Sequence, residues 1–383
     1  MTEWETKTIG DILSLEYGKP LPKADRDPSG AYPVYGANGE KAKSNKYYHD
    51  YRTIIVGRKG SAGECNLTED KFWPLDVTYF VTFDQSEHEL KFLFYMLRFQ
   101  NLPRLAKGVK PGINRNDVYA IEVVVPPLAE QKRIVSILDE AFAAIERAKE
   151  NAEKNLANAR ELFESYLNRI FTQKGKGWEE KNLADVAITF GRGKSRHRPR
   201  NDKSLYGGQY PFIQTGEIRN ADHYVTEYSK TYNEIGLAQS KLWPAGTLCI
   251  TIAANIAETA ILTFDACIPD SIIGLVCDPT KANADYVEYL LQFFKTVLQS
   301  QGKGSAQDNI NMGTFERNEF PFPSISEQER IVEVLSTLSE QKSQLEAIYQ
   351  QKLANLDELK QSLLQKAFTG QLTAKQLENE VAV

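Results

Sequence analysis

Two long stretches of the chain carry apolar residues at helical spacing and contain neither glycine nor proline. The first covers residues 129–172, and the second runs from 326 to about 368. Apolar positions in both recur at alternating intervals of three and four residues, which is the spacing of a coiled coil. The pattern predicts two long helices, each about 65 Å in length at 1.5 Å per residue.

The apolar seams of the two predicted helices differ in side-chain size. Alanine is frequent in the first seam, which consists of Ile134, Leu138, Ala141, Ile145, Ala148, Ala152, Ala159, Leu162 and Tyr166. Leucine dominates the second, which consists of Ile331, Leu335, Leu338, Leu345, Tyr349, Leu356, Leu359 and Leu363. Because small residues can face large ones, we expect the helices to pack on each other. The alternative is that each helix packs on its own domain.

Local signals mark the helix ends. Ser326 and Glu329 have the spacing of a capping box and predict the start of the second helix. Gly370 predicts its end, because glycine readily adopts the left-handed conformation of a helix C-cap. Four residues in the first turns are interpreted as scaffold, since acids there complement the helix dipole. They are Glu130, Gln131, Glu327 and Gln328.

The rest of the chain alternates short β-rich runs with Gly, Asn and Pro turns. Strands are predicted at 53–56 and 77–82, and again at 247–252 and 271–276;. The chain therefore divides into four parts. A first mixed domain covers 1–128 and is followed by a long helix at 129–172. A second mixed domain covers 173–325, and a second long helix with a C-terminal tail covers 326–383.

The second half of the chain repeats the first. Residues 130–172 align without a gap with 327–369, and 15 of these 43 positions are identical. The domains resemble each other more faintly: Tyr17-Gly18 aligns with Phe190-Gly191, and Asn114 with Asn311. Both domains end in a strand that leads to proline, at Pro126 and Pro323. A repeat of this kind predicts two similar modules related by pseudo-two-fold symmetry.

Charge is distributed unevenly along the chain. The net charge is −5, yet the segment 188–203 contains six basic residues and one acid, which suits binding of phosphates;. The basic residues are Arg192, Lys194, Arg196, Arg198, Arg200 and Lys203. No run of 18 apolar residues occurs, and the four cysteines form no Cys-x-x-Cys pair;. We therefore expect a cytoplasmic protein with reduced thiols and no membrane association.

Motifs for catalysis are missing from the sequence. A complete phosphate-binding loop, a paired-histidine metal site and a dinucleotide fingerprint are all absent;. We therefore expect a non-catalytic chain that holds no metal or cofactor. Two alternatives remain open: a nuclease or methyltransferase with unfamiliar motifs, and a coiled-coil adaptor whose lateral domains bind proteins instead of DNA.

A family resemblance lies in the segments that begin the two helices. Pro126–Val135 contains Glu-Gln-Lys-Arg-Ile-Val, and Pro323–Val332 contains Glu-Gln-Glu-Arg-Ile-Val. With these paired segments, the chain resembles the specificity subunit of a type I restriction-modification system. The segments 32–39, 54–63 and 108–114 resemble that family's target recognition domains. The second domain departs from the pattern, because Ile252–Ala257 stands where Gly57–Ser61 stands in the first.

The resemblance implies an α+β fold in which two mixed α/β target recognition domains are separated by two long antiparallel coiled-coil helices. Each domain would read one half of a bipartite, asymmetric target in double-stranded DNA. The helix pair would set the unread spacer and dock two modification (methyltransferase) subunits. S-adenosylmethionine would be bound by those subunits, and ATP with Mg by restriction subunits. A fused methyltransferase-nuclease system is an alternative setting for the same kind of chain.

Two loops of the first domain are candidates for DNA binding. The glycine-flanked loop contributes Arg58, Lys59 and Ser61, with Arg58 suited to a guanine edge. A second loop contributes Lys107 and Lys110. The alternative is that the first loop is a solvated hairpin turn.

The second domain contributes a basic loop and the counterpart of the 107–114 loop. The candidate DNA contacts are Arg192, Lys194, Arg196, Arg198, Arg200, Lys303, Gln307 and Asn309. The alternative for the basic segment is a disordered surface loop. Asn114 and Asn311 occupy equivalent positions in domains that should read different bases, so we predict that both cap turns.

Overall fold

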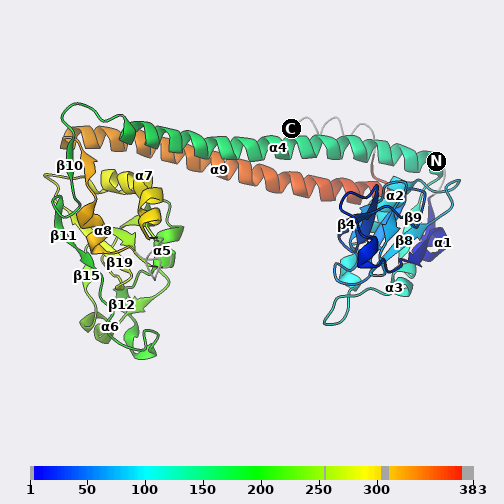
Figure 1. The fold of residues 1–383 in the computed structure, drawn as a ribbon, viewed down its shortest axis with the longest axis horizontal. Coiled ribbons are helices and arrows are strands. Elements are labelled where there is room, and N and C mark those ends of the chain that lie inside the picture. Colours follow the sequence, from blue (N-terminus) through cyan, green and yellow to red (C-terminus); the bar gives the residue numbers. More distant parts are fainter. Residues whose placement is uncertain (1–3, 254–255, 303–309, 373–383) are drawn as a thin grey trace. The chain divides into compact units, whose positions relative to one another are not determined.

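The computed structural model describes residues 4–253, 256–302 and 310–372. The chain forms two compact units: Met1–Glu153 with Gln350–Val383, and Lys154–Tyr349. Each unit therefore contains one globular domain and part of each long helix (Figure 1). Helix α4 covers Leu128–Thr172 and helix α9 covers Ile325–Phe368.

In the first unit, a four-stranded antiparallel sheet has the strand order β2-β8-β5-β6. Strands β1 and β9 pair separately, beside the start of α4. The elements in chain order are β1 (Glu5–Thr8), α1 (Ile9–Ile12), β2 (Ser14–Tyr17), β3 (Tyr32–Gly36), β4 (Gly39–Ser44), β5 (Ile54–Gly57), β6 (Cys65–Leu67), β7 (Trp73–Pro74), β8 (Thr78–Thr82), α2 (Leu90–Phe99), α3 (Arg115–Tyr119) and β9 (Glu122–Val125).

In the second unit, the corresponding sheet has the order β11-β19-β16-β17-β13, and β10 pairs with β20 as β1 does with β9. The elements are β10 (Glu179–Lys181), β11 (Ala187–Arg192), β12 (Tyr206–Pro211), α5 (Thr215–Asn220), β13 (Tyr224–Val225), β14 (Thr231–Tyr232), α6 (Glu234–Ala238), β15 (Leu242–Trp243), β16 (Leu248–Thr251), β17 (Thr259–Leu262), β18 (Ala266–Cys267), β19 (Ile272–Cys277), α7 (Ala284–Gly302), α8 (Met312–Arg317) and β20 (Phe320–Phe322). The internal repeat is thus structural, and the predicted fold class is confirmed.

Most elements predicted from the sequence are present. All four predicted strands form with ends displaced by at most one residue, and both helices begin one residue earlier than expected. This earlier start makes the capping box wrong, because Ser326 lies inside the first turn of α9 rather than before it. Gly370 ends that helix as predicted: its φ is +74°, and the N–H of Gln371 donates to the Lys366 carbonyl at 2.9 Å.

The two long helices run antiparallel within each unit. In the first unit Lys360 bonds to Glu146 at 2.6 Å and Lys149 pairs with Asp357. In the second, Arg160 bonds to Glu346 at 2.6 Å. In these three pairs, each step forward along α4 matches an equal step backward along α9. The antiparallel pairing of the helices therefore has the same register in each unit.

The predicted seam is correct for the first two thirds of α4 and wrong beyond it. Ile134, Leu138 and Ala141 are buried, whereas Leu162 is 55% exposed. Past Ala159 the buried residues recur every fourth position, at Phe163, Leu167 and Phe171. They face the second domain, where Phe163 and Phe171 contact aromatic rings of α7. Here packing on a domain is added to helix–helix packing, since Lys342 of α9 still lies 5.1 Å from the centroid of the Phe163 ring.

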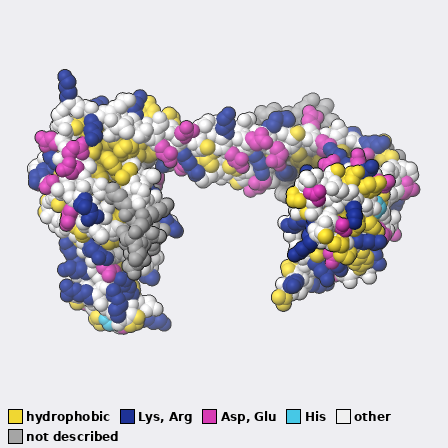
Figure 2. All heavy atoms as spheres, viewed as in Figure 1, with side chains coloured by type: hydrophobic (Ala, Val, Ile, Leu, Met, Phe, Trp, Pro, Cys, Tyr) yellow, Lys and Arg dark blue, Asp and Glu magenta, His cyan; other side chains and the backbone are white. Residues whose placement is uncertain are grey.

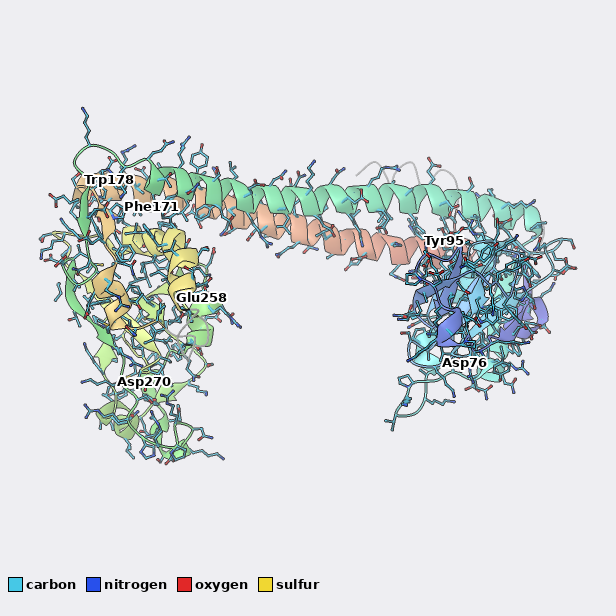
Figure 3. The ribbon with its side chains drawn as sticks, in the orientation of Figure 1. Asp76, Tyr95, Phe171, Trp178, Glu258 and Asp270 are labelled. Carbon is cyan, nitrogen blue, oxygen red and sulfur yellow. The ribbon has the colours of Figure 1, made fainter. Side chains whose placement is uncertain are left out.

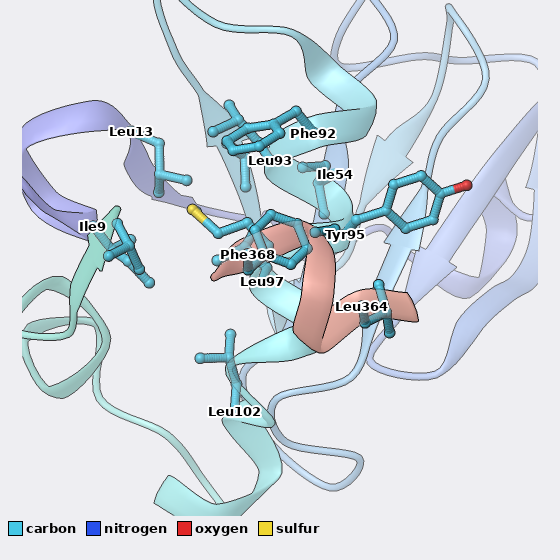
Figure 4. Packing of buried hydrophobic residues seen from close by; sticks show 14 of the residues in the cluster. Ile9, Leu13, Ile54, Phe92, Leu93, Tyr95, Leu97, Leu102, Leu364 and Phe368 are labelled. Atoms are coloured by element: carbon cyan, nitrogen blue, oxygen red, sulfur yellow. The ribbon is translucent and has the colours of Figure 1, made fainter. Parts of the chain in front are cut away.

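The seam of α9 shows a similar departure. Leu345 is 39% exposed, although it was placed in the seam, and Tyr166 of α4 is only half-buried. At its C-terminal end α9 enters the core of the first unit, where Phe368 lies close to Leu97 (Figure 4). The Phe368 ring also stacks on Phe99, with ring centroids 5.3 Å apart. Each helix therefore packs both on its partner helix and on a domain.

A buried glutamine anchors each long helix to its domain. Gln131 accepts from the N–H of Glu89 at 2.9 Å and donates to the carbonyls of Glu87 and Pro126. Gln328 makes the same three bonds, with the N–H of Asn283 and the carbonyls of Lys281 and Pro323. Neither side chain exceeds 1% exposure. The scaffold role predicted for these glutamines is confirmed.

Candidate nucleic-acid interface

Two loops of the first domain that are distant in sequence lie side by side. The N–H of Gly60 donates to the Pro111 carbonyl at 2.8 Å, and the N–H of Ile113 donates to the Arg58 carbonyl at 3.0 Å. The two predicted DNA-binding loops, 57–63 and 107–114, therefore form one surface. Lys59 and Lys110 are exposed on it, and Ser61 is half-buried.

Arg58 is held by its own domain. Its Nε and Nη2 donate to the Asp76 carbonyl at 3.1 and 2.6 Å, and its guanidinium lies 5.4 Å from the Tyr17 ring centroid. These bonds leave three of the five guanidinium N–H groups for a ligand. Arg115 lies over the same ring at 5.2 Å. Sequence reasoning missed Arg115, although it directly follows the predicted turn cap Asn114.

Lys107 adds a further cation to this surface. Its Nζ lies 3.0 Å from Asp117, while the side chain remains 79% exposed. A surface ion pair of this kind contributes little to stability, so phosphate can readily compete for the ammonium group.

Asp270 organises the basic loop of the second domain. Its carbonyl accepts from Nε and Nη2 of Arg192 at 2.8 and 2.5 Å. Its carboxylate accepts two bonds from Arg200, at 2.6 and 2.8 Å, and Arg198 lies 3.6 Å away. Three of the five predicted DNA contacts are thus already engaged by one acid. Hydrogen bonds to Asp270 therefore hold this loop in place.

A second acid, Asp202, fixes the far end of the same loop. Bonds from the N–H and hydroxyl of Ser204, together with one from His197, lower the pKa of Asp202 to about 2. The carboxylate therefore remains charged at any physiological pH. The Tyr206 hydroxyl adds a bond to the Arg200 carbonyl at 2.6 Å.

Lys194 and Arg196 differ from the other basic residues of this loop. Both are exposed, and neither side chain has an acceptor among the residues that the structure describes. Lys241 lies nearby, and its pKa is lowered by burial and by the positive charge of Lys194. Figure 2 shows Lys and Arg side chains gathered on the part of the second domain away from α4. The side chains of Lys194 and Arg196 are therefore available to bind phosphates.

In both domains, an arginine is bound at the same end of the main sheet. Asp76 and Asp270 each stand two residues before an equivalent strand, β8 or β19, on the side of their domain away from the helices (Figure 3). In both, the main-chain carbonyl is bound by an arginine. That arginine follows β5 in the first domain and ends β11 in the second.

This equivalence corrects the alignment of Gly18 with Gly191. Gly18 donates to the Thr78 carbonyl, and Gly193 donates to the Ile272 carbonyl at the matching position of the sheet. A Cβ on Gly18 or Gly193 would lie 2.1 or 2.3 Å from a backbone oxygen, so both sites exclude a side chain. The register of β11 shifts between Ala187 and Thr189, which the sequence comparison did not detect.

The two asparagines that follow the candidate loops cap helices. Asn114 accepts from the N–H of Asn116 at 3.0 Å, and Asn311 accepts from the N–H of Thr314 at 3.2 Å. The prediction of turn caps is confirmed. Lys303, Gln307 and Asn309 lie outside the described residues.

Sites for other chemistry were sought in the described ranges. Within 4–253, 256–302 and 310–372, no group of His, Cys, Asp and Glu is arranged to hold a metal ion, and no helix is long and apolar enough to cross a membrane. The four cysteines are free thiols, as predicted, and burial raises the pKa of Cys65 to about 12. A thiol with that pKa is a poor nucleophile.

Comparison with known proteins gives the family. A model described as the type I restriction modification DNA specificity domain matches residues 1–154 and 175–355. The chain belongs to this family. Both matched regions contain one domain and part of a long helix, so the family pattern spans the repeat.

Individual members of the family are distant in sequence. The chain is 22% identical to the type I restriction enzyme EcoDI specificity subunit of Escherichia coli, over 97% of this chain and 89% of that protein. It is 24% identical to the MjaVIII specificity subunit of Methanocaldococcus jannaschii, over 98% and 94%.

Solved structures of such proteins share the fold. A chain in a structure of a type I R-M system matches with a TM-score of 0.77 at 19% identity, covering 97% of this chain and 99% of that one. The HsdS subunit from Thermoanaerobacter tengcongensis matches with a TM-score of 0.61 at 19% identity, covering 97% and 98%.

Proposed function

We propose that the chain is the DNA sequence-specificity subunit of a type I restriction-modification complex. The observation that carries this proposal is the family match over both halves of the chain. The fold supports it, because one sheet-and-helix module occurs twice and its equivalent edge is basic in both copies. The chain itself would contribute recognition and no catalysis.

Each domain, 1–128 and 173–325, would read one half of a bipartite target in double-stranded DNA. The scaffolds are equivalent, but the side chains at the reading edge differ. In the first domain that edge carries Arg58, Lys59 and Lys110, and in the second it carries Lys194 and Arg196. Because base contacts specify sequence while phosphate contacts position the protein, different side chains should give different half-sites.

The helix pair would set the spacer between the half-sites and dock two modification subunits. Large apolar side chains remain uncovered on the outer faces of α4 and α9, at Leu162, Val334 and Ile348 with exposures of 55, 41 and 59%. Such residues suit contact with a partner protein. The modification subunits would bind S-adenosylmethionine, and restriction subunits would bind ATP and Mg, on DNA in the cytoplasm.

Mapping of N6-methyladenine in host DNA, by single-molecule sequencing with and without this gene, tests the proposal. A split, asymmetric motif should disappear when the gene is deleted and return when it is restored. Unchanged methylation, together with failure of the chain to retain a modification subunit in a pull-down, would contradict the proposed role.

A further inference from the structure

The tip of the 107–112 loop presents an apolar side chain entirely to solvent. Val109 has a relative exposure of 105%, and the next most exposed large apolar side chain in the described part of the chain is Ile188 at 67%. Single exposed apolar residues are common on protein surfaces. Val109 differs from the others because the backbone holds it away from the domain, beside the candidate reading surface.

The loop that carries Val109 is closed and anchored. Lys107 and Gly112 exchange two backbone hydrogen bonds, of 2.9 and 3.1 Å, so the tip is a narrow turn. The base of the loop is tied to the Arg58 loop through Gly60 and Ile113. Lys107 and Gly112 form an isolated β-bridge, so the loop is a narrow hairpin-like turn. A major groove accepts a two-stranded ribbon, which is an element of similar width.

The surroundings of Val109 are cationic. Lys107 and Lys110 flank it, and Lys59 stands on the adjoining loop. The acid bonded to this loop is Asp117, through Lys107, on the side of α3. The surface therefore suits a polyanion with an apolar group between its charges. In the major groove that group is the C5-methyl of thymine, which lies between two phosphate backbones.

We propose that Val109 contacts the methyl group of a thymine in the half-site read by the first domain. This inference rests on the proposed function and adds to it one residue that distinguishes bases. Lys107 and Lys110 would meet the phosphates on either side, and the backbone bonds at Gly60 and Ile113 would fix the depth of insertion.

Deoxyuridine substitution tests the contact, because uracil differs from thymine only by the absence of this methyl group. The chain is assembled with its modification subunit, and its Kd is measured on the mapped target. Duplexes with each thymine of both half-sites replaced singly by deoxyuridine are then compared. For the wild type we expect one position, in one half-site only, to weaken binding about three- to tenfold.

The variant Val109→Ser should bind the thymine duplex about three- to tenfold more weakly and be indifferent to deoxyuridine at that position. Val297→Ser, which removes an exposed valine from α7 of the second domain, should retain the wild-type response. Agreement of both variants with these expectations supports the contact.

Other outcomes overturn it. If wild type and Val109→Ser respond alike to every deoxyuridine while specific binding persists, the inference fails and the proposed function stands. A rise in 2-aminopurine fluorescence that depends on Val109, without a deoxyuridine effect, would indicate base unstacking instead. Loss of modification-subunit binding in Val109→Ser would assign the tip to protein contact. Binding no tighter to the target than to a scrambled duplex would overturn both proposals.

Discussion

At the scale of single residues, the arginines of the second domain have two different roles. Arg200 is engaged by the carboxylate of Asp270, whereas the guanidinium of Arg196 has no acceptor among the described residues. An arginine already paired with an acid is less available to phosphate. We therefore expect fewer DNA contacts from this loop than its number of basic residues predicts.

Arg196→Ala should reduce the salt dependence of DNA binding. Loss of one phosphate contact lowers the slope of log K against log salt by about one. Arg200→Ala is the matched control and should leave the slope nearly unchanged, because its charge is compensated by Asp270. Binding by the assembled complex is measured between about 50 and 200 mM salt. If both variants lose the same amount of slope in log K against log salt, Arg200 binds DNA despite its pairing with Asp270.

At the scale of elements, one buried glutamine near the start of each long helix makes three hydrogen bonds to backbone groups. We call each of these sets of three hydrogen bonds a glutamine clasp. Gln328 satisfies three backbone groups that lie between α9 and the start of α7. Its side chain is fully buried, so water cannot replace these bonds;. Glu327 and Arg330 form an additional pair on the surface of the same turn.

Gln328→Met should lower the free energy of unfolding by about 2–3 kcal/mol, because it leaves buried N–H and C=O groups without partners. Gln131→Met, in the equivalent clasp of the first domain, should have a similar cost. Gln350→Met, at an exposed position of α9, should stay within about 0.5 kcal/mol of the wild type;. Urea denaturation followed by circular dichroism measures the differences. Equal midpoints for Gln328→Met and Gln350→Met would refute a stabilising clasp.

At the scale of the whole molecule, the two domains are joined to the long helices by equivalent contacts. β1 pairs with β9 and β10 with β20, so each domain enters and leaves the helices through an equivalent strand pair. The clasps at Gln131 and Gln328 are likewise the same in both copies. A domain should therefore fit on either site of the scaffold.

Replacing Trp178–Pro323 with Trp4–Pro126 should produce a chain that reads its first half-site twice. Because the sequence repeat predicts modules related by pseudo-two-fold symmetry, the two copies should appear as an inverted repeat with an unchanged spacer. Methylation mapping measures the motif. The reciprocal exchange serves as control and should duplicate the other half-site. A motif that retains both original half-sites would rule out domain-by-domain reading.

The sequence by itself determined the features that depend on local pattern. The long helices follow from helical periodicity without glycine or proline, and Gly370, Asn114 and Asn311 follow from the conformations and bonds those residue types favour. The repeat determined the two-module architecture, because similar sequences fold alike.

Tertiary structure alone decided the features that depend on distant partners. It joined the 57–63 and 107–114 loops, paired Arg200 with Asp270 and shifted the seam of α4 at Phe163. It also placed His223 between Asp285 and Glu288. Burial there lowers the histidine's pKa, but the bonds and charges of the two acids outweigh it and raise the pKa to about 9. Charge pairing and burial depend on which groups meet in space, and the order of residues along the chain does not state that.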